Sequence, residues 1–127
     1  MKKKGQAIEE LLQLRLVAKF ESDDSVSYPG LENESMKGTI THLVNQCIDD
    51  FIVLVKNNAR EEDFQQAISK GLSYFETVKF SLDTEDRERV CRYFEEMMDA
   101  IELESSGGLL NEWMYGFDPT GSPSGTS

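Results

Sequence analysis

The sequence predicts an all-α fold, a bundle of four main helices followed by a short C-terminal helix. Apolar residues recur at helical spacing along several long segments. The chain has only three prolines, and two of them lie in the last nine residues, so long stretches are free to be helical. Short connections near residues 59–60 and 81–83 favour antiparallel neighbouring helices. The length of 127 residues fits one domain, which we place at 1–118 and follow with a flexible C-terminal tail at 119–127.

The first predicted helix covers residues 6–20. Ile8, Leu11, Leu12 and Leu16 form its apolar stripe, while Leu14 and Val17 point elsewhere, so this helix is apolar on two sides. A short strand-like run at 14–20 is the alternative, and we favour the helix. A polar connector follows at 21–35, with a turn predicted at Tyr28-Pro29-Gly30 because glycine accepts a positive φ.

The helix predicted at residues 36–58 has the widest apolar face. With ~100° per residue, its apolar side chains cover half of the helical wheel. A face this wide must contact at least two neighbours, so we expect this helix to be central. The residues on the face are Ile40, Leu43, Val44, Cys47, Ile48, Phe51, Leu54 and Val55.

Three further helices are predicted at residues 61–80, from Asp83 or Thr84 to just before Ser105, and at 109–117. The first of them has carboxylates in its first turn, where they favour the positive end of the helix dipole. Gly71 lies in its buried stripe and implies close approach by a neighbouring helix. Asp83 and Thr84 are both good N-caps for the second.

The chain is acidic, with a net charge of −11. Without the three lysines at positions 2–4, ten positive charges stand against 24 negative ones, a net −14. This balance argues against nucleic acid and anionic membranes as partners, and it is compatible with a basic protein partner or with solubility alone. No apolar run approaches the ~20 residues of a membrane span, and we expect a cytoplasmic protein.

Few residues suggest chemistry, and we expect no catalytic residue, metal or cofactor. His42, the only histidine, lies ~20° from Asp49 on the helical wheel, but a solvated surface position is the commoner explanation. Cys47 and Cys91 form no disulfide framework and fit small buried residues. The segment 105–108 could bind an anion at a helix start, although a plain turn is favoured.

Paired carboxylates offer an enzymatic alternative. Glu85-x-x-Glu88 and Glu96-x-x-Asp99 have the spacing used by Mg²⁺-dependent all-α nucleotide pyrophosphohydrolases. In that family the two pairs lie on different helices, whereas here both belong to one helix and point away from its apolar stripe. A solvated acidic face is therefore the favoured interpretation.

The densest aromatic stretch lies near the C-terminus. Trp113, Tyr115 and Phe117 could close one end of the bundle as a lid, or form a contact surface, and the two roles are compatible. As candidate partner-binding residues we take these three aromatic residues together with acidic residues of the preceding helix. The acidic residues are Glu95, Glu96 and Asp99.

Several segments carry a resemblance to a known family. They are Tyr28-Pro29-Gly30-Leu31, the run at 64–72, the run at 83–88, Tyr93-Phe94-Glu95, and 103–111 with Trp113 and Tyr115-Gly116-Phe117. In these the chain resembles a set of short, acidic bacterial proteins catalogued only as a domain of unknown function. The resemblance covers about residues 7–118 and implies one helical domain from a bacterial source. It brings no activity and no catalytic residues.

Charge, the missing catalytic constellation and the aromatic patch together favour a non-enzymatic protein-binding module. Its concrete form is a small acidic helical protein that caps a basic partner, in the manner of bacterial toxin-immunity proteins. The alternatives are the Mg²⁺-dependent hydrolase and a homodimer with a structural or regulatory role, which the two-sided first helix suggests.

Overall fold

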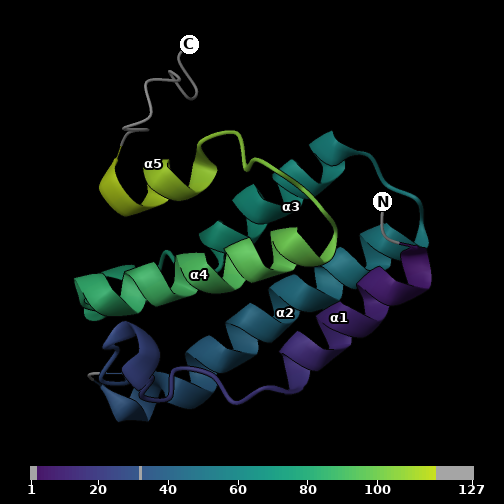
Figure 1. Cartoon of the computed structure of the whole chain (residues 1–127). Coiled ribbons are helices and arrows are strands. Elements are labelled where there is room, and N and C mark those ends of the chain that lie inside the picture. Colours follow the sequence, from purple (N-terminus) through teal and green to yellow (C-terminus); the bar gives the residue numbers. More distant parts are fainter. Residues whose placement is uncertain (1–2, 32, 117–127) are drawn as a thin grey trace.

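Five α-helices build the part of the chain that the structure, a computed structural model, describes: residues 3–31 and 33–116 (Figure 1). The main helices are α1 (Lys4–Leu16), α2 (Lys37–Lys56), α3 (Glu61–Ser73) and α4 (Thr84–Ala100), and α5 (Leu109–Tyr115) is the short C-terminal helix. The connections contain the 3-10 helices η1 (Asp24–Val26), η2 (Glu34–Met36) and η3 (Lys79–Ser81). No β-strand occurs in the described ranges, and the all-α prediction is confirmed.

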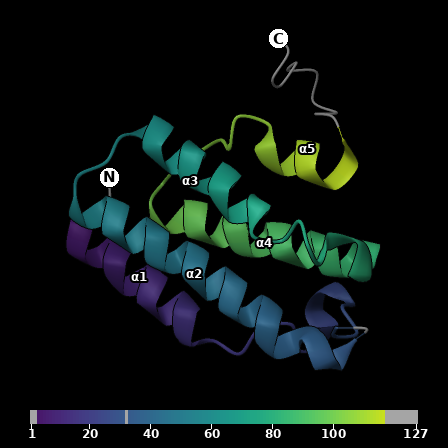
Figure 2. The same ribbon diagram turned by 180° about the vertical axis from the view of Figure 1, so that it is seen from behind.

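Helix α2 is the central helix, as its wide apolar face predicted. It packs against α1, α3 and α4, and α4 packs in turn against α1 and α5. Helices α1 and α2 lie side by side in both views and run antiparallel (Figures 1 and 2). At one end of this pair, Nζ of Lys4 donates to the carbonyl of Lys56 at 3.3 Å.

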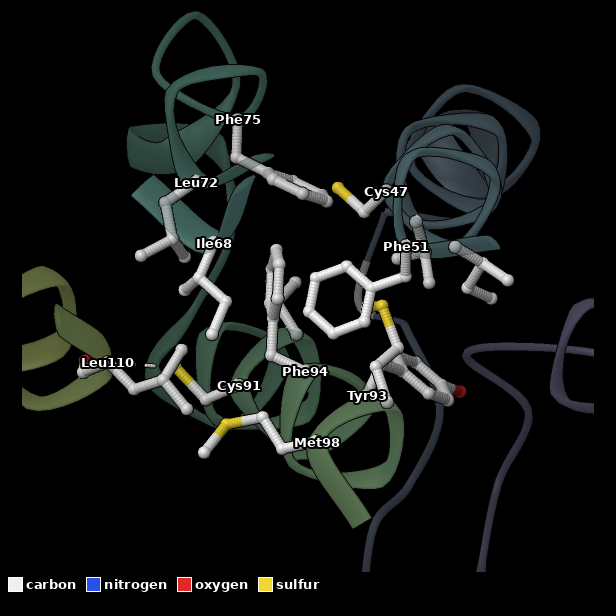
Figure 3. Close-up of a cluster of buried hydrophobic side chains, with 14 of the residues drawn as sticks. Cys47, Phe51, Ile68, Leu72, Phe75, Cys91, Tyr93, Phe94, Met98 and Leu110 are labelled. Carbon is white, nitrogen blue, oxygen red and sulfur yellow. Dashed lines mark hydrogen bonds between the residues drawn. The ribbon is translucent and has the colours of Figure 1, made fainter. Parts of the chain in front are cut away.

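The core lies where α2, α3, α4 and α5 converge (Figure 3). Its aromatic rings meet edge to face: Phe51 and Phe64 have centroids 5.4 Å apart, and Phe75 lies 6.5 Å from Phe94. Such pairs add about 0.5–1.5 kcal/mol beyond the area that they bury. Leu110 brings α5 onto the same cluster.

Gly71 provides the close helix approach that its position in the stripe predicted. A Cβ atom built on Gly71 would lie 2.7 Å from Sγ of Cys47 on α2, and 3.0 Å from Cζ of Phe94 on α4. A side chain at this position would force Cys47 or Phe94 to shift. The glycine therefore lets α3 approach both α2 and α4, which offsets its cost in helix propensity.

Carboxylates accept backbone hydrogen bonds at two helix starts, of which the N-cap at Asp83 was predicted. The side chain of Asp83 accepts a hydrogen bond from the backbone N–H of Asp86 at 2.8 Å, which makes Asp83 the N-cap of α4. At the start of α3, the carboxylate of Asp63 accepts from the N–H of Arg60 at 3.0 Å. Each carboxylate satisfies an amide that the helix itself leaves without a partner.

The predicted extension of the third helix to residue 80 is wrong, because α3 ends at Ser73. Beyond it the chain tightens into turns. The N–H of Tyr74 donates to the carbonyl of Gly71 at 3.0 Å, and that of Phe75 to Leu72 at 3.1 Å. These i to i−3 bonds rotate the chain differently from an α-helix, and they bring Phe75 into the core with no exposed surface.

The predicted stripe of the first helix is also wrong in part. Helix α1 covers 4–16 rather than 6–20, and Ala7 and Leu11 are its buried residues. Leu12 and Leu16 are 46% and 77% exposed. Because the helix is apolar on two sides, periodicity alone could not select the buried face.

The connector at 21–35 is polar in composition, but some of its side chains are buried. Tyr28 and Leu31 are buried, and Gly30 has the expected positive φ, +95°. The predicted turn itself is wrong, because the N–H of Leu31 donates to the carbonyl of Phe20 at 3.3 Å instead of closing a turn at Tyr28-Pro29-Gly30. The connector lies at the end of the bundle beneath the start of α4 (Figure 1). The predicted tail at 119–127 and its boundary at 118 lie outside the described residues.

Candidate functional site

An acidic groove runs between α1 and α4. We define it by the eight residues that line an open hollow of about 590 Å³: Gln6, Glu9, Glu10, Gln13, Leu14, Glu96, Asp99 and Ala100. Four of these are carboxylates and none is basic. The groove therefore presents negative charge from two helices that are far apart in sequence.

Contacts of Phe20, which follows α1, join this part of the chain to α4. The rings of Phe20 and Tyr93 meet edge to face with centroids 5.1 Å apart, and the N–H of Phe20 donates to Oη of Tyr93 at 2.8 Å. Both residues are buried. Phe20 lies four residues beyond Leu16, so these contacts fasten the segment after α1 to α4.

Glu96 is a partly buried carboxylate of the groove. Burial raises the pKa of Glu96, Asp99 acts in the same direction, and the cations Arg92, Arg89 and Lys19 act against both. A raised carboxyl pKa means that the surroundings disfavour the charged form. The negative charge at this position is therefore held at some cost to stability.

A neighbouring hollow of about 810 Å³ shares Glu96 and Asp99 with the acidic groove. Glu95, Glu102 and Glu104 also line it, together with the cation Arg92. The structure thus brings together all three acidic residues that the sequence put forward, Glu95, Glu96 and Asp99. Sequence reasoning missed Glu9 and Glu10, since no local pattern showed which helix would pack beside α4.

Trp113 and Tyr115, the two C-terminal aromatic residues that the structure describes, differ in burial. Trp113 is only 7% exposed, its ring lies edge to face with Phe75 at 6.3 Å, and its Nε1 donates to Oε2 of Glu76 at 3.2 Å. Tyr115 is 53% exposed, and Phe117 lies outside the described residues. The buried indole of Trp113 fits the lid role, and its role in partner contact stays a prediction.

Comparison with known proteins places the chain in a family. The model of a family described as a domain of unknown function, DUF4844, matches residues 2–118. The chain belongs to the DUF4844 family. A solved structure of a DUF3571 family protein from Acinetobacter baumannii AYE is similar, with 32% identity, a TM-score of 0.80, and coverage of 89% of this chain and 91% of that one. No curated protein matches the chain.

The resemblance to a family of unknown function is thereby confirmed for this DUF4844 protein, and the similar structure supports the all-α fold. Neither description names an activity, a ligand or a partner. Helices long and apolar enough to cross a membrane are absent from the described residues.

The carboxylate pairs of the hydrolase alternative lie apart in this DUF4844 chain. Glu85 and Glu88 line a small pocket of about 230 Å³ with Arg89 and Arg92, whereas Glu96 and Asp99 line the acidic groove. Across residues 3–31 and 33–116, no three histidine, cysteine or acidic side chains are grouped so that they could hold a metal ion.

The remaining candidates are His42, the two cysteines and the turn at 105–108. His42 is exposed on α2, and Asp49 pairs with Arg15 instead, at 2.7 Å from Oδ1 to Nε and 3.1 Å from Oδ2 to Nη2. Cys47 and Cys91 are free and buried, and burial raises the pKa of each thiol to about 12. In the turn at 105–108, Nε2 of Gln65 donates to the carbonyl of Ser105 at 3.0 Å, which ties the turn to α3.

A buried polar cluster under the connector was missed by sequence reasoning. Oη of Tyr28 donates to Oδ1 of Asp86 at 2.7 Å, and both side chains are almost fully buried. The Arg89 guanidinium lies 5.1 Å from the Tyr28 ring centroid and 5.4 Å from that of Tyr93, and Nη2 is 3.3 Å from Oδ2 of Asp23. These contacts fasten the connector to α4.

Proposed function

We propose that this DUF4844 protein is a non-enzymatic protein-binding module that binds a basic partner through the acidic groove, in the manner of toxin-immunity proteins. The single observation that carries the proposal is the groove itself. Four carboxylates from two helices line it, and none of its eight lining residues is basic. A surface of this kind favours a partner that presents several lysines or arginines.

The charge of the whole chain supports the same partner class. A net charge of −11 attracts a basic protein over a distance of about 10 Å at moderate salt, and it repels nucleic acid and acidic proteins. Association through such a surface is fast at low salt and weakens as salt rises. Salt dependence is therefore part of the expected signature.

The positions of the reactive side chains favour binding over catalysis. Nucleophilic cysteines need a lowered pKa, whereas burial raises the pKa of Cys47 and of Cys91 to about 12. A general base is most often a histidine held by a carboxylate, but Asp49 is paired with Arg15. These observations support a role in which shape and charge, rather than bond chemistry, do the recognition.

The test compares two variants with the same change in charge. Glu96→Lys/Asp99→Lys reverses two charges in the acidic groove, and Glu61→Lys/Glu62→Lys reverses two exposed charges in the first turn of α3. Each immobilised protein is offered extract of the source organism at about 50 mM and about 300 mM NaCl, and the retained proteins are identified by mass spectrometry.

A basic protein retained by the wild type and by the α3 variant, lost by the groove variant and released at the higher salt, would support the proposal. Circular dichroism of both variants checks that they fold. The proposal fails if the groove variant retains the same proteins as the wild type, or if the α3 variant loses them equally.

A further inference from the structure

The C-terminal end of α1 exposes apolar side chains that the bundle does not use. Leu12 is 46%, Leu16 is 77% and Val17 is 56% exposed. Single exposed apolar residues are common, but three of them within six residues at the end of one helix make a local apolar surface. We call Leu12, Leu16 and Val17 the apolar end of α1.

Two residues of the apolar end, Leu16 and Val17, continue the α1 wall of the acidic groove. Gln13 lines the groove, and Leu16 and Val17 follow it at i+3 and i+4, the spacing that places side chains one helical turn further along the same side. A segment that lies along the groove and reaches this end of α1 would therefore meet carboxylates first and apolar side chains next.

The end of α1 is held rigidly. Lys19 is only 1% exposed, and its Nζ donates to the carbonyls of Leu14, Arg15 and Val17 at 2.7, 3.1 and 3.0 Å. These are carbonyls that a helix end otherwise leaves without partners. Because the backbone is fixed, a partner would lose little free energy in ordering the apolar end.

Charge decides which partner covers this surface. A second copy of the chain also carries a net charge of −11, so bringing two such surfaces together is opposed by repulsion, and an anionic membrane is opposed in the same way. The cation nearest in sequence, Arg15, is neutralised by its pair with Asp49. A basic segment experiences attraction instead.

We propose that the partner segment is a basic amphipathic helix, whose cations face the carboxylates of the acidic groove and whose apolar side chains cover Leu16 and Val17. This proposal rests on the proposed function and refines it, since it names the form of the bound segment. Apolar contact supplies affinity that salt does not screen, and charge supplies steering and orientation.

The experiment uses two synthetic peptides of about 18 residues, long enough for roughly 27 Å of helix. One contains only lysine and leucine, with leucine at helical i, i+3, i+4 spacing; in the other, glutamine replaces every leucine. Binding of each labelled peptide is measured by fluorescence anisotropy against wild type, Leu16→Ser/Val17→Ser and Glu96→Lys/Asp99→Lys. The matched apolar control is Phe80→Ser, because Phe80 is 89% exposed elsewhere on the chain.

The wild type should bind the lysine–leucine peptide about tenfold more tightly than the lysine–glutamine peptide, and Leu16→Ser/Val17→Ser should remove most of that difference. Phe80→Ser should leave it unchanged, and Glu96→Lys/Asp99→Lys should weaken both peptides. The inference is overturned if Leu16→Ser/Val17→Ser and Phe80→Ser reduce the difference in affinity between the two peptides equally, or if Leu16→Ser/Val17→Ser does not reduce it. In either case the proposed function stays intact if Glu96→Lys/Asp99→Lys still weakens binding of both peptides.

Light scattering of the free protein provides the other outcome. If the wild type is a dimer at high salt and Leu16→Ser/Val17→Ser is a monomer, a second copy covers the apolar end and the inference is wrong. If Glu96→Lys/Asp99→Lys binds both peptides as the wild type does, the proposed function itself fails.

Discussion

The most direct test of the packing is Gly71→Ala. The added Cβ would lie 2.7 Å from Sγ of Cys47 and 3.0 and 3.1 Å from two ring carbons of Phe94. Cys47 and Phe94 are 1% and 0% exposed, so neither can swing into solvent. Forcing an extra carbon into a packed core costs about 1–3 kcal/mol, whereas exchanging glycine for alanine inside a helix gains roughly 1 kcal/mol.

With three contacts under 3.2 Å, we expect the upper part of that range and a net loss of about 1–2 kcal/mol in the free energy of unfolding. The melting temperature should fall by about 4–7 °C for a chain of this size. Urea unfolding followed by circular dichroism measures the change, with Gly38→Ala as the control. Gly38 also lies in a helix, α2, but a Cβ there would meet nothing within 4 Å.

The contact with Cys47 can be tested separately by a double-mutant cycle. If the clash with Sγ is the cause, Cys47→Ala should reduce the cost of Gly71→Ala, and the two changes should be non-additive. A Gly71→Ala protein as stable as the wild type would refute the reasoning. So would a loss equal to that in Gly38→Ala, since that result would assign the effect to the backbone rather than to the contact.

Three further predictions concern titratable groups. Tyr28→Phe should lower the free energy of unfolding by about 1–3 kcal/mol at pH 7, because Asp86 loses its 2.7 Å donor. Burial, and then Asp86, raise the pKa of Tyr28, so the wild type should lose this stability as pH rises above about 10. A stability–pH profile of the wild type that runs parallel to that of Tyr28→Phe would contradict this. Glu96→Gln should raise stability at neutral pH, because the raised pKa of Glu96 in the folded state gives stability that is present below about pH 4 and lost as pH rises. Chemical unfolding at pH 4 and pH 7 measures the difference. No gain in stability at pH 7 would show that the cost of burying the charge is negligible. Cys47 and Cys91 should react with a thiol reagent only after unfolding, because both are buried with pKa values near about 12; rapid labelling of the native protein would contradict their burial.

Sequence patterns predicted the central part of this fold well. The helix expected at 36–58 is α2 at 37–56, because a half-wheel of apolar residues leaves one consistent orientation. The expected N-cap at Asp83 is present, since capping depends on side chains within three residues. Where local chemistry determines the structure, the sequence was sufficient.

Long-range contacts explain what the sequence did not reveal. Phe20 meets Tyr93, and Tyr28 meets Asp86, across separations of 73 and 58 residues, and no helical period records such pairs. The same limit applies to the candidate site. The acidic residues of α4 were identified from their own helix, but the contribution of α1 depends on which face of α1 turns inward.

Stability and charge oppose each other in the acidic groove, and this opposition bears on its role. Burial and Asp99 disfavour a negative charge on Glu96, so glutamine of nearly the same shape should fold better at neutral pH. Groups that reduce stability are common at binding sites. Glu96→Gln should therefore both stabilise the fold and weaken the binding of a basic partner. A stabilised variant that binds such a partner unchanged would separate the charge from function.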